Sequence, residues 1–238
     1  MVHLKKIFLA LLLYLFPLGF ALCNPTLKLV ANEWPPYTSD HVSGKGTEVE
    51  HVRRMLSKAG YDTTIEIVPW ARALQLVYAG QADGIIAIWS TDERRQKIAF
   101  SEAYSANTLR LYSVKGKSRK ILSIKDLAGQ IIAVGRAYEY SDEFLKMNNF
   151  RKEAGVGTLH DIQKLIKGRV DAVLEDEQIF RYYVENNFSL LGNMDEFDAS
   201  PAIMVLPLYF GITRKRPDAQ RIIENFNQIL AREKMLVK

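Results

Sequence analysis

Aromatic rings stand beside a charged side chain at two places in the first half of the sequence. Trp34 and Tyr37 flank two consecutive prolines, which stiffen the loop and hold both rings in defined directions. Trp89 is followed by Thr91, which can cap a short helix whose inner face carries Arg94. A guanidinium can grip a carboxylate through charge-assisted hydrogen bonds, worth about 1.5–3 kcal/mol where water is excluded. These residue types predict capture of a small polar molecule.

The second half of the sequence offers an acid and two further rings. Asp176 follows a β-branched run and could receive a ligand's ammonium group while Arg94 holds its carboxylate, or it could simply cap the helix that begins there. Tyr138 and Tyr140 alternate in an extended loop, so we expect both to face one way and to add rings to the lining. Stacking or a cation–π contact contributes about 0.5–2 kcal/mol per ring.

Each candidate also has a purely structural interpretation. Trp34 and Tyr37 could pack on a neighbouring helix, and the two later tyrosines could cover a rim of the fold. Trp70 is expected in the core. The guanidinium of Arg94 could instead form an ion pair with one of the nearby acids, Asp92, Glu93 and Glu102.

Composition excludes several kinds of site. Cys23 is the single cysteine, so no disulfide and no thiolate metal site is expected in the chain that follows it. His41, His51 and His160 have no partner at the spacing of metal ligands. Phosphate loops, dinucleotide fingerprints and nucleophile elbows are missing from the sequence. We therefore expect no cofactor and no metal.

The first residues predict export. Lys5 and Lys6 precede an apolar run from Ile7 to Ala21, which is typical of a signal peptide over residues 1–23. Removal before Leu22 or before Asn24 would release a soluble protein into the periplasm of a Gram-negative bacterium. The alternative is lipid attachment at Cys23.

The charge pattern argues against nucleic acid as a partner. Lys5 and Lys6 contribute two of the formal net charge of +5, which leaves +3 for residues 24–238. Lys and Arg are scattered among acids rather than gathered in a stripe, so we expect no nucleic-acid partner.

Alternation of strand and helix patterns predicts an α/β fold with a mainly parallel sheet in each of two lobes. The expected strands are Leu27–Ala31, Thr63–Val68, Gly84–Ile88, Thr108–Val114, Ile131–Val134, Val170–Leu174 and Met204–Thr213. The expected helices are Thr47–Ala59, Ala71–Tyr78, Ile124–Leu127, Asp142–Met147, Leu159–Ile166, Gln178–Glu185 and Asp218–Glu233.

We divide the chain after the leader into residues 24–107 for the first part of lobe 1, residues 108–200 for lobe 2, and residues 201–238 for a return to lobe 1 with a C-terminal helix. Two crossings, near Ala106 and near Pro201, would form a hinge. Ligands of open α/β sheets bind beyond the carboxyl ends of the strands, so the site is expected in the cleft between the lobes.

Taken in order, these segments resemble the family 3 extracellular solute-binding proteins, which serve amino-acid uptake transporters. The resemblance covers nearly all of the chain after the leader and rests on the following pieces: Trp34-Pro35-Pro36-Tyr37, Gly80-Gln81-Ala82-Asp83-Gly84, Thr91-Asp92-Glu93-Arg94, Asp126-Leu127-Ala128-Gly129 and Gly168-Arg169-Val170-Asp171-Ala172-Val173. It implies a Venus-flytrap fold in which Arg94 holds the ligand's carboxylate, Asp176 its ammonium, and Trp34 covers it.

Two segments depart from the pattern of the amino-acid binders. Ala87, Ile88 and Trp89 stand where hydroxyl residues often contact the ligand, and Glu139-Tyr140 replaces a common Gly-Thr pair. Both changes leave the ligand open.

We therefore expect a monomeric, non-catalytic binding protein that delivers a small amino acid, carboxylate or amine to an inner-membrane ABC permease. One alternative is a periplasmic lyase or dehydratase on a cyclic carboxylic acid, with Glu139 or Asp176 as general acid or base. Another is a stand-alone sensory protein.

Overall fold

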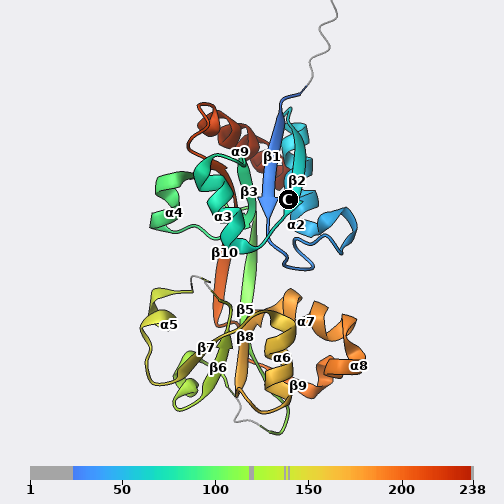
Figure 1. Ribbon diagram of the computed structural model, residues 1–238, viewed down its shortest axis with the longest axis vertical. Helices are drawn as coiled ribbons and strands as arrows, with labels where there is room; N and C mark the ends of the chain where they lie inside the picture. The colour runs from blue at the N-terminus through green and yellow to red at the C-terminus, as the bar shows by residue number, and fades with distance from the viewer. Residues whose placement is uncertain (1–23, 118–120, 137, 139, 237–238) are drawn as a thin grey trace, which may run out of the picture.

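Two lobes, one above the other, make up the computed structural model (Figure 1), which describes residues 24–117, 121–136, 138 and 140–236. The expected signal peptide and Cys23 lie outside the described residues. None of the described helices is both long enough and apolar enough to cross a membrane.

The upper lobe is built on parallel strands from the start of the chain. Strand β1 lies between β2 and β3 and is parallel to both. All residues of β3 are buried, whereas every second residue of β2 is exposed, because β2 forms the edge of the sheet. The elements are β1 (Thr26–Ala31), η1 (Ser43–Lys45), α2 (Thr47–Lys58), β2 (Asp62–Ile67), α3 (Trp70–Ala79), β3 (Gly84–Ile88), α4 (Asp92–Lys97) and β4 (Ile98–Phe100).

The lower lobe repeats this plan with β6 at the centre of its parallel strands. Strand β6 is parallel to β7 and to β8, and β8 in turn pairs antiparallel with β5. The elements are β5 (Ser105–Val114), η2 (Ile124–Leu127), β6 (Ile131–Val134), α5 (Asp142–Lys146), β7 (Arg151–Ala154), α6 (Thr158–Ile166), β8 (Ala172–Asp176), α7 (Glu177–Asn186), α8 (Phe188–Leu191), η3 (Met194–Glu196) and β9 (Phe197–Ala199).

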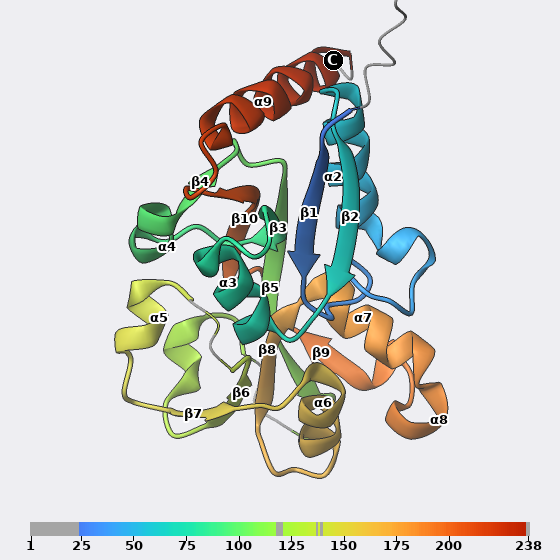
Figure 2. The ribbon, with the colours of Figure 1, turned by 45° about the horizontal axis from the view of Figure 1, so that its top comes forward.

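Two long strands pass between the lobes side by side. Strand β10 (Met204–Thr213) pairs antiparallel with the first half of β5, from Ser105 to Leu109. Beyond this stretch β10 pairs with β3 of the upper lobe and β5 pairs with β8 of the lower lobe. The final helix α9 (Ala219–Leu236) then packs on the upper lobe (Figure 2). The lobes are therefore joined by one ribbon of two strands.

The strongly periodic segments form as predicted, with boundaries shifted by a few residues. Helix α3 ends at Gly80, whose φ of +73° is a left-handed conformation that glycine adopts without a steric penalty. Strand β8 begins two residues later than predicted and extends to Asp176, and β5 begins at Ser105 rather than Thr108.

Several short elements were not predicted. Strand β7 has the polar sequence RKEA and is half exposed, so it carries no hydrophobic alternation and is held by backbone pairing with β6. Strands β4 and β9 and helix α8 are each four residues or shorter. Elements of this size are fixed by their neighbours rather than by their own pattern.

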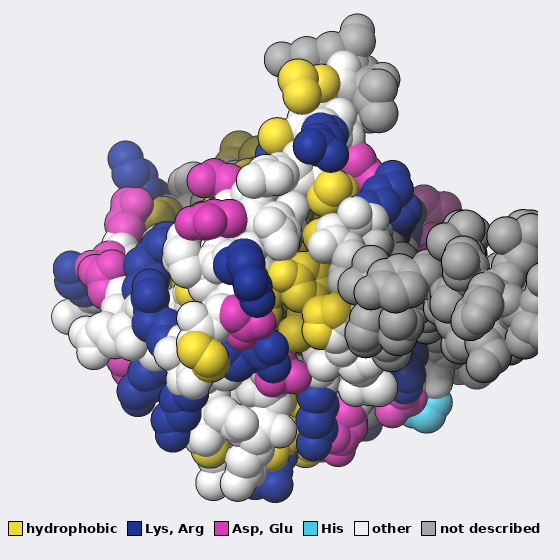
Figure 3. All heavy atoms as spheres, turned by 90° about the horizontal axis from the view of Figure 1, so that it is seen from above, with side chains coloured by type: hydrophobic (Ala, Val, Ile, Leu, Met, Phe, Trp, Pro, Cys, Tyr) yellow, Lys and Arg dark blue, Asp and Glu magenta, His cyan; other side chains and the backbone are white. Residues whose placement is uncertain are grey.

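Charged residues on the face seen from above agree with the scattered pattern in the sequence. Basic and acidic side chains are interspersed there (Figure 3). The described part of this face therefore offers no broad basic stripe for a polyanion.

Candidate binding cleft

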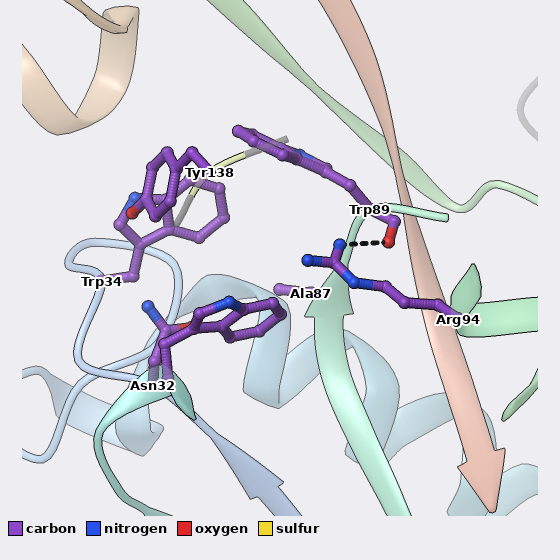
Figure 4. Close-up of a pocket in the computed structure, with 7 residues that line it drawn as sticks. Asn32, Trp34, Ala87, Trp89, Arg94 and Tyr138 are labelled. Carbon is purple, nitrogen blue, oxygen red and sulfur yellow. Dashed lines mark hydrogen bonds between the residues drawn. The ribbon is translucent and has the colours of Figure 1, made fainter. Parts of the chain in front are cut away.

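A cavity with about 310 Å³ of empty space, part of it open to solvent, lies between the lobes (Figure 4). Six of its lining residues come from the upper lobe, and Tyr138 comes from the loop after β6 of the lower lobe. The lining is Asn32, Trp34, Trp70, Ala87, Trp89, Arg94 and Tyr138. The cavity lies at the carboxyl ends of β1, β3 and β6, which is where a ligand site was expected.

Helix α4 places Arg94 in this cavity. The hydroxyl of Thr91 accepts a hydrogen bond from Arg94 N at 3.2 Å, which caps the helix as predicted. Arg94 is then 3% exposed, whereas its neighbour Arg95 faces solvent. Arg94 Nη1 donates to the carbonyl of Trp89 at 2.8 Å, and its guanidinium carbon lies 5.1 Å from the centre of the Trp70 ring. The head of Arg94 is therefore held in one place among aromatic rings.

Three rings from two lobes form the wall that faces Arg94. Tyr138 meets Trp34 and Trp89 edge-on, with centroids 6.1 and 5.2 Å apart, and the two indoles are 6.0 Å apart. Burial raises the pKa of the Tyr138 hydroxyl well above its usual value. Edge-to-face pairs of this kind contribute about 0.5–1.5 kcal/mol each beyond their buried area.

Tyr37 and Asp176 lie beside the cavity rather than on its lining, and they join the lobes. The hydroxyl of Tyr37 donates to Asp176 Oδ1 at 2.9 Å. The same oxygen caps α7 by accepting from Gln178 N and Ile179 N, while Oδ2 accepts from Asn107 Nδ2 and Thr108 N. Burial raises the pKa of Asp176, and the hydrogen bond from Tyr37 opposes that rise.

Five donors use the lone pairs of this carboxylate in full. Contact between Asp176 and a ligand's ammonium group would therefore require one of these hydrogen bonds to open. The capping role that the sequence left open is the one that the structure displays.

Tyr138 and Tyr140 lie 6.2 Å apart and both contact Trp89, but only Tyr138 lines the cavity that contains Arg94. The hydroxyl of Tyr140 accepts from Gly135 N at 2.7 Å, and its ring packs on Phe144. The Tyr140 ring lies 6.3 Å from the Trp89 ring and lines another cavity. Glu139 lies outside the described residues.

Three lining residues were not among the candidates. Trp70 was assigned to the core, but it is only partly buried and lines the cavity at the start of α3. Asn32 directly follows β1, and this position at a strand's carboxyl end was a signal that could have identified it. Ala87 lies within β3 with a φ of +55°, a left-handed conformation that nothing in the sequence indicates.

A second cavity, with about 920 Å³ of empty space that is partly open to solvent, adjoins the first and shares Asn32, Trp34, Trp70 and Tyr138 with it. Two buried acids from the lower lobe line this second cavity. Asp161 is 4% exposed and Glu175 is 7% exposed. Burial raises the pKa of Glu175 to about 7, although hydrogen bonds from the Thr158 hydroxyl and from Asp176 N oppose the rise.

The described residues contain no group of three His, Cys, Asp or Glu side chains that could hold a metal ion. What the cleft contains is a fixed cation, aromatic walls and buried acids. Such an arrangement can bind a small polar molecule through charge-assisted hydrogen bonds and stacking.

Comparisons with known proteins agree with this geometry. The L-cystine-binding protein TcyJ of Escherichia coli (strain K12) is 29% identical over 150 residues, which are 60% of this chain and 55% of TcyJ. The arginine-binding extracellular protein ArtP of Bacillus subtilis (strain 168) is 26% identical over 152 residues, which are 62% of this chain and 58% of ArtP. The aligned region thus spans less than two thirds of either relative.

An ancestral arginine-binding protein bound to arginine has the same two-lobed fold. It superimposes with a TM-score of 0.73 at 20% identity, over 90% of this chain and 94% of that structure. A family description, that of the bacterial extracellular solute-binding proteins, family 3, matches residues 28–235. Because this match covers nearly all of the described residues, the chain belongs to the bacterial extracellular solute-binding proteins, family 3.

Proposed function

We propose that this protein captures a small amino acid or a related carboxylate between its lobes and passes it to an ABC permease. The observation that carries the proposal is the buried Arg94 in a cavity whose wall is completed by Tyr138 of the other lobe. An amino acid is the class of ligand named for both curated relatives, L-cystine for TcyJ and arginine for ArtP.

In this proposal the ligand's carboxylate binds the guanidinium of Arg94, and Trp34, Trp89 and Tyr138 cover the rest of the molecule. Tyr37, Tyr140 and Asp176 support these residues through the hydrogen bonds and ring contacts described above. A ligand that contacts both lobes stabilises the closed arrangement by its differential contacts, and the permease recognises the closed form.

The remaining expectations fit this role. We propose that residues 1–23 direct export to the periplasm and are removed, and that the protein acts as a monomer. We also keep the division of the chain at residues 107/108 and 200/201, because the first point lies within the stretch of β5 that pairs with β10 and the second lies shortly before β10 begins.

The position of Asp176 favours binding over the alternative of a lyase. Of the two acids considered for proton transfer, Asp176 is engaged by five donors and does not line either cavity next to Arg94. Membership in a family of solute-binding proteins supports the same preference.

Substitution of Arg94 tests the proposal. The natural L-amino acids and L-cystine are screened by thermal shift, and the affinity of each hit is measured by calorimetry. Arg94→Ala should weaken binding at least about tenfold, which corresponds to the loss of one charge-assisted hydrogen bond. Arg95→Ala is the matched control, because Arg95 is the next residue of α4 and faces solvent. Equal affinity in the two variants, or a screen without a single hit, would reject the proposal.

A further inference from the structure

The second cavity differs from the first in the sign of its buried charge. Its charged lining residues are Glu33 and Arg136, which are exposed at the rim, and the buried Asp161 and Glu175. The rim charges oppose each other, so acids determine the character of the interior. Trp34, Trp70, Tyr138 and Tyr183 supply aromatic walls.

We propose that this second cavity binds the positively charged side chain of the ligand, an ammonium or guanidinium group, with Glu175 and Asp161 as its acceptors. This inference rests on the proposed function. It adds the class of amino acid: a basic one, with its carboxylate at Arg94 and its cationic end in the adjoining cavity.

Glu175 is a buried carboxylate that no described cation neutralises. Its oxygens accept from the Thr158 hydroxyl at 2.6 Å and from Asp176 N at 2.9 Å. Neither donor carries a charge, and among the described residues no ion pair involves Glu175. Each oxygen keeps acceptor capacity, so a cationic ligand group would supply the missing partner.

Asp161 borders the same cavity and is partly balanced by Lys164, whose Nζ lies 3.2 Å from Asp161 Oδ1 and 3.0 Å from Glu153 Oε1. The backbone of Gly155 approaches Asp161 so closely that a Cβ at this position would lie 1.7 Å from Oδ2. A side chain at residue 155 would therefore displace the carboxylate. The glycine leaves Asp161 its place at the cavity wall.

An independent observation indicates that a ligand atom belongs where the two cavities meet. Trp34 lines both cavities and is 6% exposed, yet its ring N–H has no hydrogen-bond acceptor among the described residues. A buried N–H without an acceptor costs about 1–3 kcal/mol. A carboxylate or other acceptor on the ligand would satisfy it. The aromatic walls add cation–π attraction for the opposite end.

The experiment compares charged ligands with neutral ones of similar shape, using the protein without its proposed signal peptide. L-arginine is paired with L-citrulline, and L-lysine with L-norleucine, in calorimetric titrations. The cationic member of at least one pair should bind about tenfold more tightly or better, since a charge-assisted hydrogen bond to a buried acid is lost in its partner.

Two isosteric variants locate the effect. At least one of the two variants, Glu175→Gln and Asp161→Asn, should reduce the preference for the cationic ligand by about tenfold. In both variants the affinity for the neutral ligand should change less than threefold. Glu185→Gln, at an exposed position of α7, should leave the preference unchanged. Melting curves show whether each variant folds, and the wild-type comparison stands even if one does not.

The results separate this inference from the proposed function. If a neutral amino acid binds as tightly as its cationic partner, or if only neutral amino acids bind, the second cavity does not select a cation and the inference is overturned while the proposed function stands. If no amino acid binds at all, both fail. A preference for cations that neither acid affects also overturns the assignment to Glu175 and Asp161.

Discussion

Glu175 combines two properties that rarely occur together, deep burial and the absence of a cationic partner among the described residues. Burial raises its pKa from 4.5 to about 7, so the folded protein holds the neutral form over most of the weakly acidic range. Such an acid is costly to keep charged. A cost of this kind is tolerated where it serves binding.

The raised pKa predicts how stability changes with pH. The contribution of the Glu175 carboxyl to folding stability is fully present below pH 4.5, its pKa in the unfolded chain. It is lost as the pH rises through about 7, its pKa in the folded protein, because the unfolded chain releases the proton more readily. The free energy of unfolding of Glu175→Gln, relative to that of the wild type, should therefore rise by on the order of 3 kcal/mol between pH 5 and pH 8. Denaturant unfolding at both pH values measures this difference.

The ionisable groups around Glu175 are two acids whose own pKa values are raised by burial, Asp176 and Asp161, and three tyrosines. Asp176 and Asp161 raise the pKa of Glu175 by their charge, and the tyrosines at 138, 140 and 183 have raised pKa values and stay neutral in this window. Glu185→Gln serves as the exposed control. If the free energy of unfolding varies with pH in the same way for the wild type and Glu175→Gln, the pKa of Glu175 is not raised in the folded protein.

Strand β3 shows at the level of an element how the cavity floor is formed. Its sequence is uniformly apolar and it is buried throughout, yet Ala87 has a φ of +55°. The pairing of β10 with β3 shifts register nearby, between Tyr209 and Gly211. A residue with a Cβ in this conformation costs about 1–2 kcal/mol. The end of β3 is therefore strained where it meets Arg94 and Trp89.

Replacement by glycine detects this strain. Ala87→Gly loses a buried methyl group and gains chain entropy in the unfolded state, but it relieves the left-handed conformation, so its stability should stay within about 0.5 kcal/mol of the wild type. Ala133→Gly in β6 is the matched control, because Ala133 is fully buried and does not have a positive φ. It should cost about 1–2 kcal/mol. Equal losses in urea unfolding would show that Ala87 is not strained.

At the scale of the whole molecule, hydrogen bonds between the lobes connect the hinge to the cavity wall. The hydroxyl of Tyr37 and the carboxylate of Asp176 are 139 residues apart in the chain, and their hydrogen bond joins the two lobes beside the strands that connect them. Asn107, on one of those strands, donates to Asp176 and accepts from Trp89 Nε1 at 2.8 Å. The hinge, the interlobe contact and the cavity wall thus share one hydrogen-bond network.

Removal of the Tyr37 hydroxyl tests this network. Tyr37→Phe should lower ligand affinity several-fold although Tyr37 does not line the cavity, because the arrangement with the lobes in contact loses an interlobe hydrogen bond. The radius of gyration of the ligand-free protein, from X-ray scattering, should rise. Tyr61→Phe removes a hydroxyl that bonds Asn225 within the upper lobe, so it should affect stability alone. If both variants bind like the wild type, Tyr37 does not hold the lobes together.

The sequence by itself determined the α/β class, the long periodic elements, and the direction of Arg94 from the cap at Thr91. These features depend on signals that act within one or two turns of chain: alternation, helical period, capping and proline-stiffened loops. Local signals also brought Trp34 and Trp89 to attention, because Trp89 directly follows a strand and Trp34 stands beside two prolines in the loop after one.

Only the tertiary structure decided what these residues meet. It placed Trp70 on the cavity lining as well as against the core, left Tyr140 outside the lining that Tyr138 completes, and joined Asp176 to five donors. Each of these outcomes depends on groups that lie far apart in the chain and approach only when the two lobes pack together. No periodicity or spacing records such contacts, since the free energy that selects them comes from burial and hydrogen bonding across the fold.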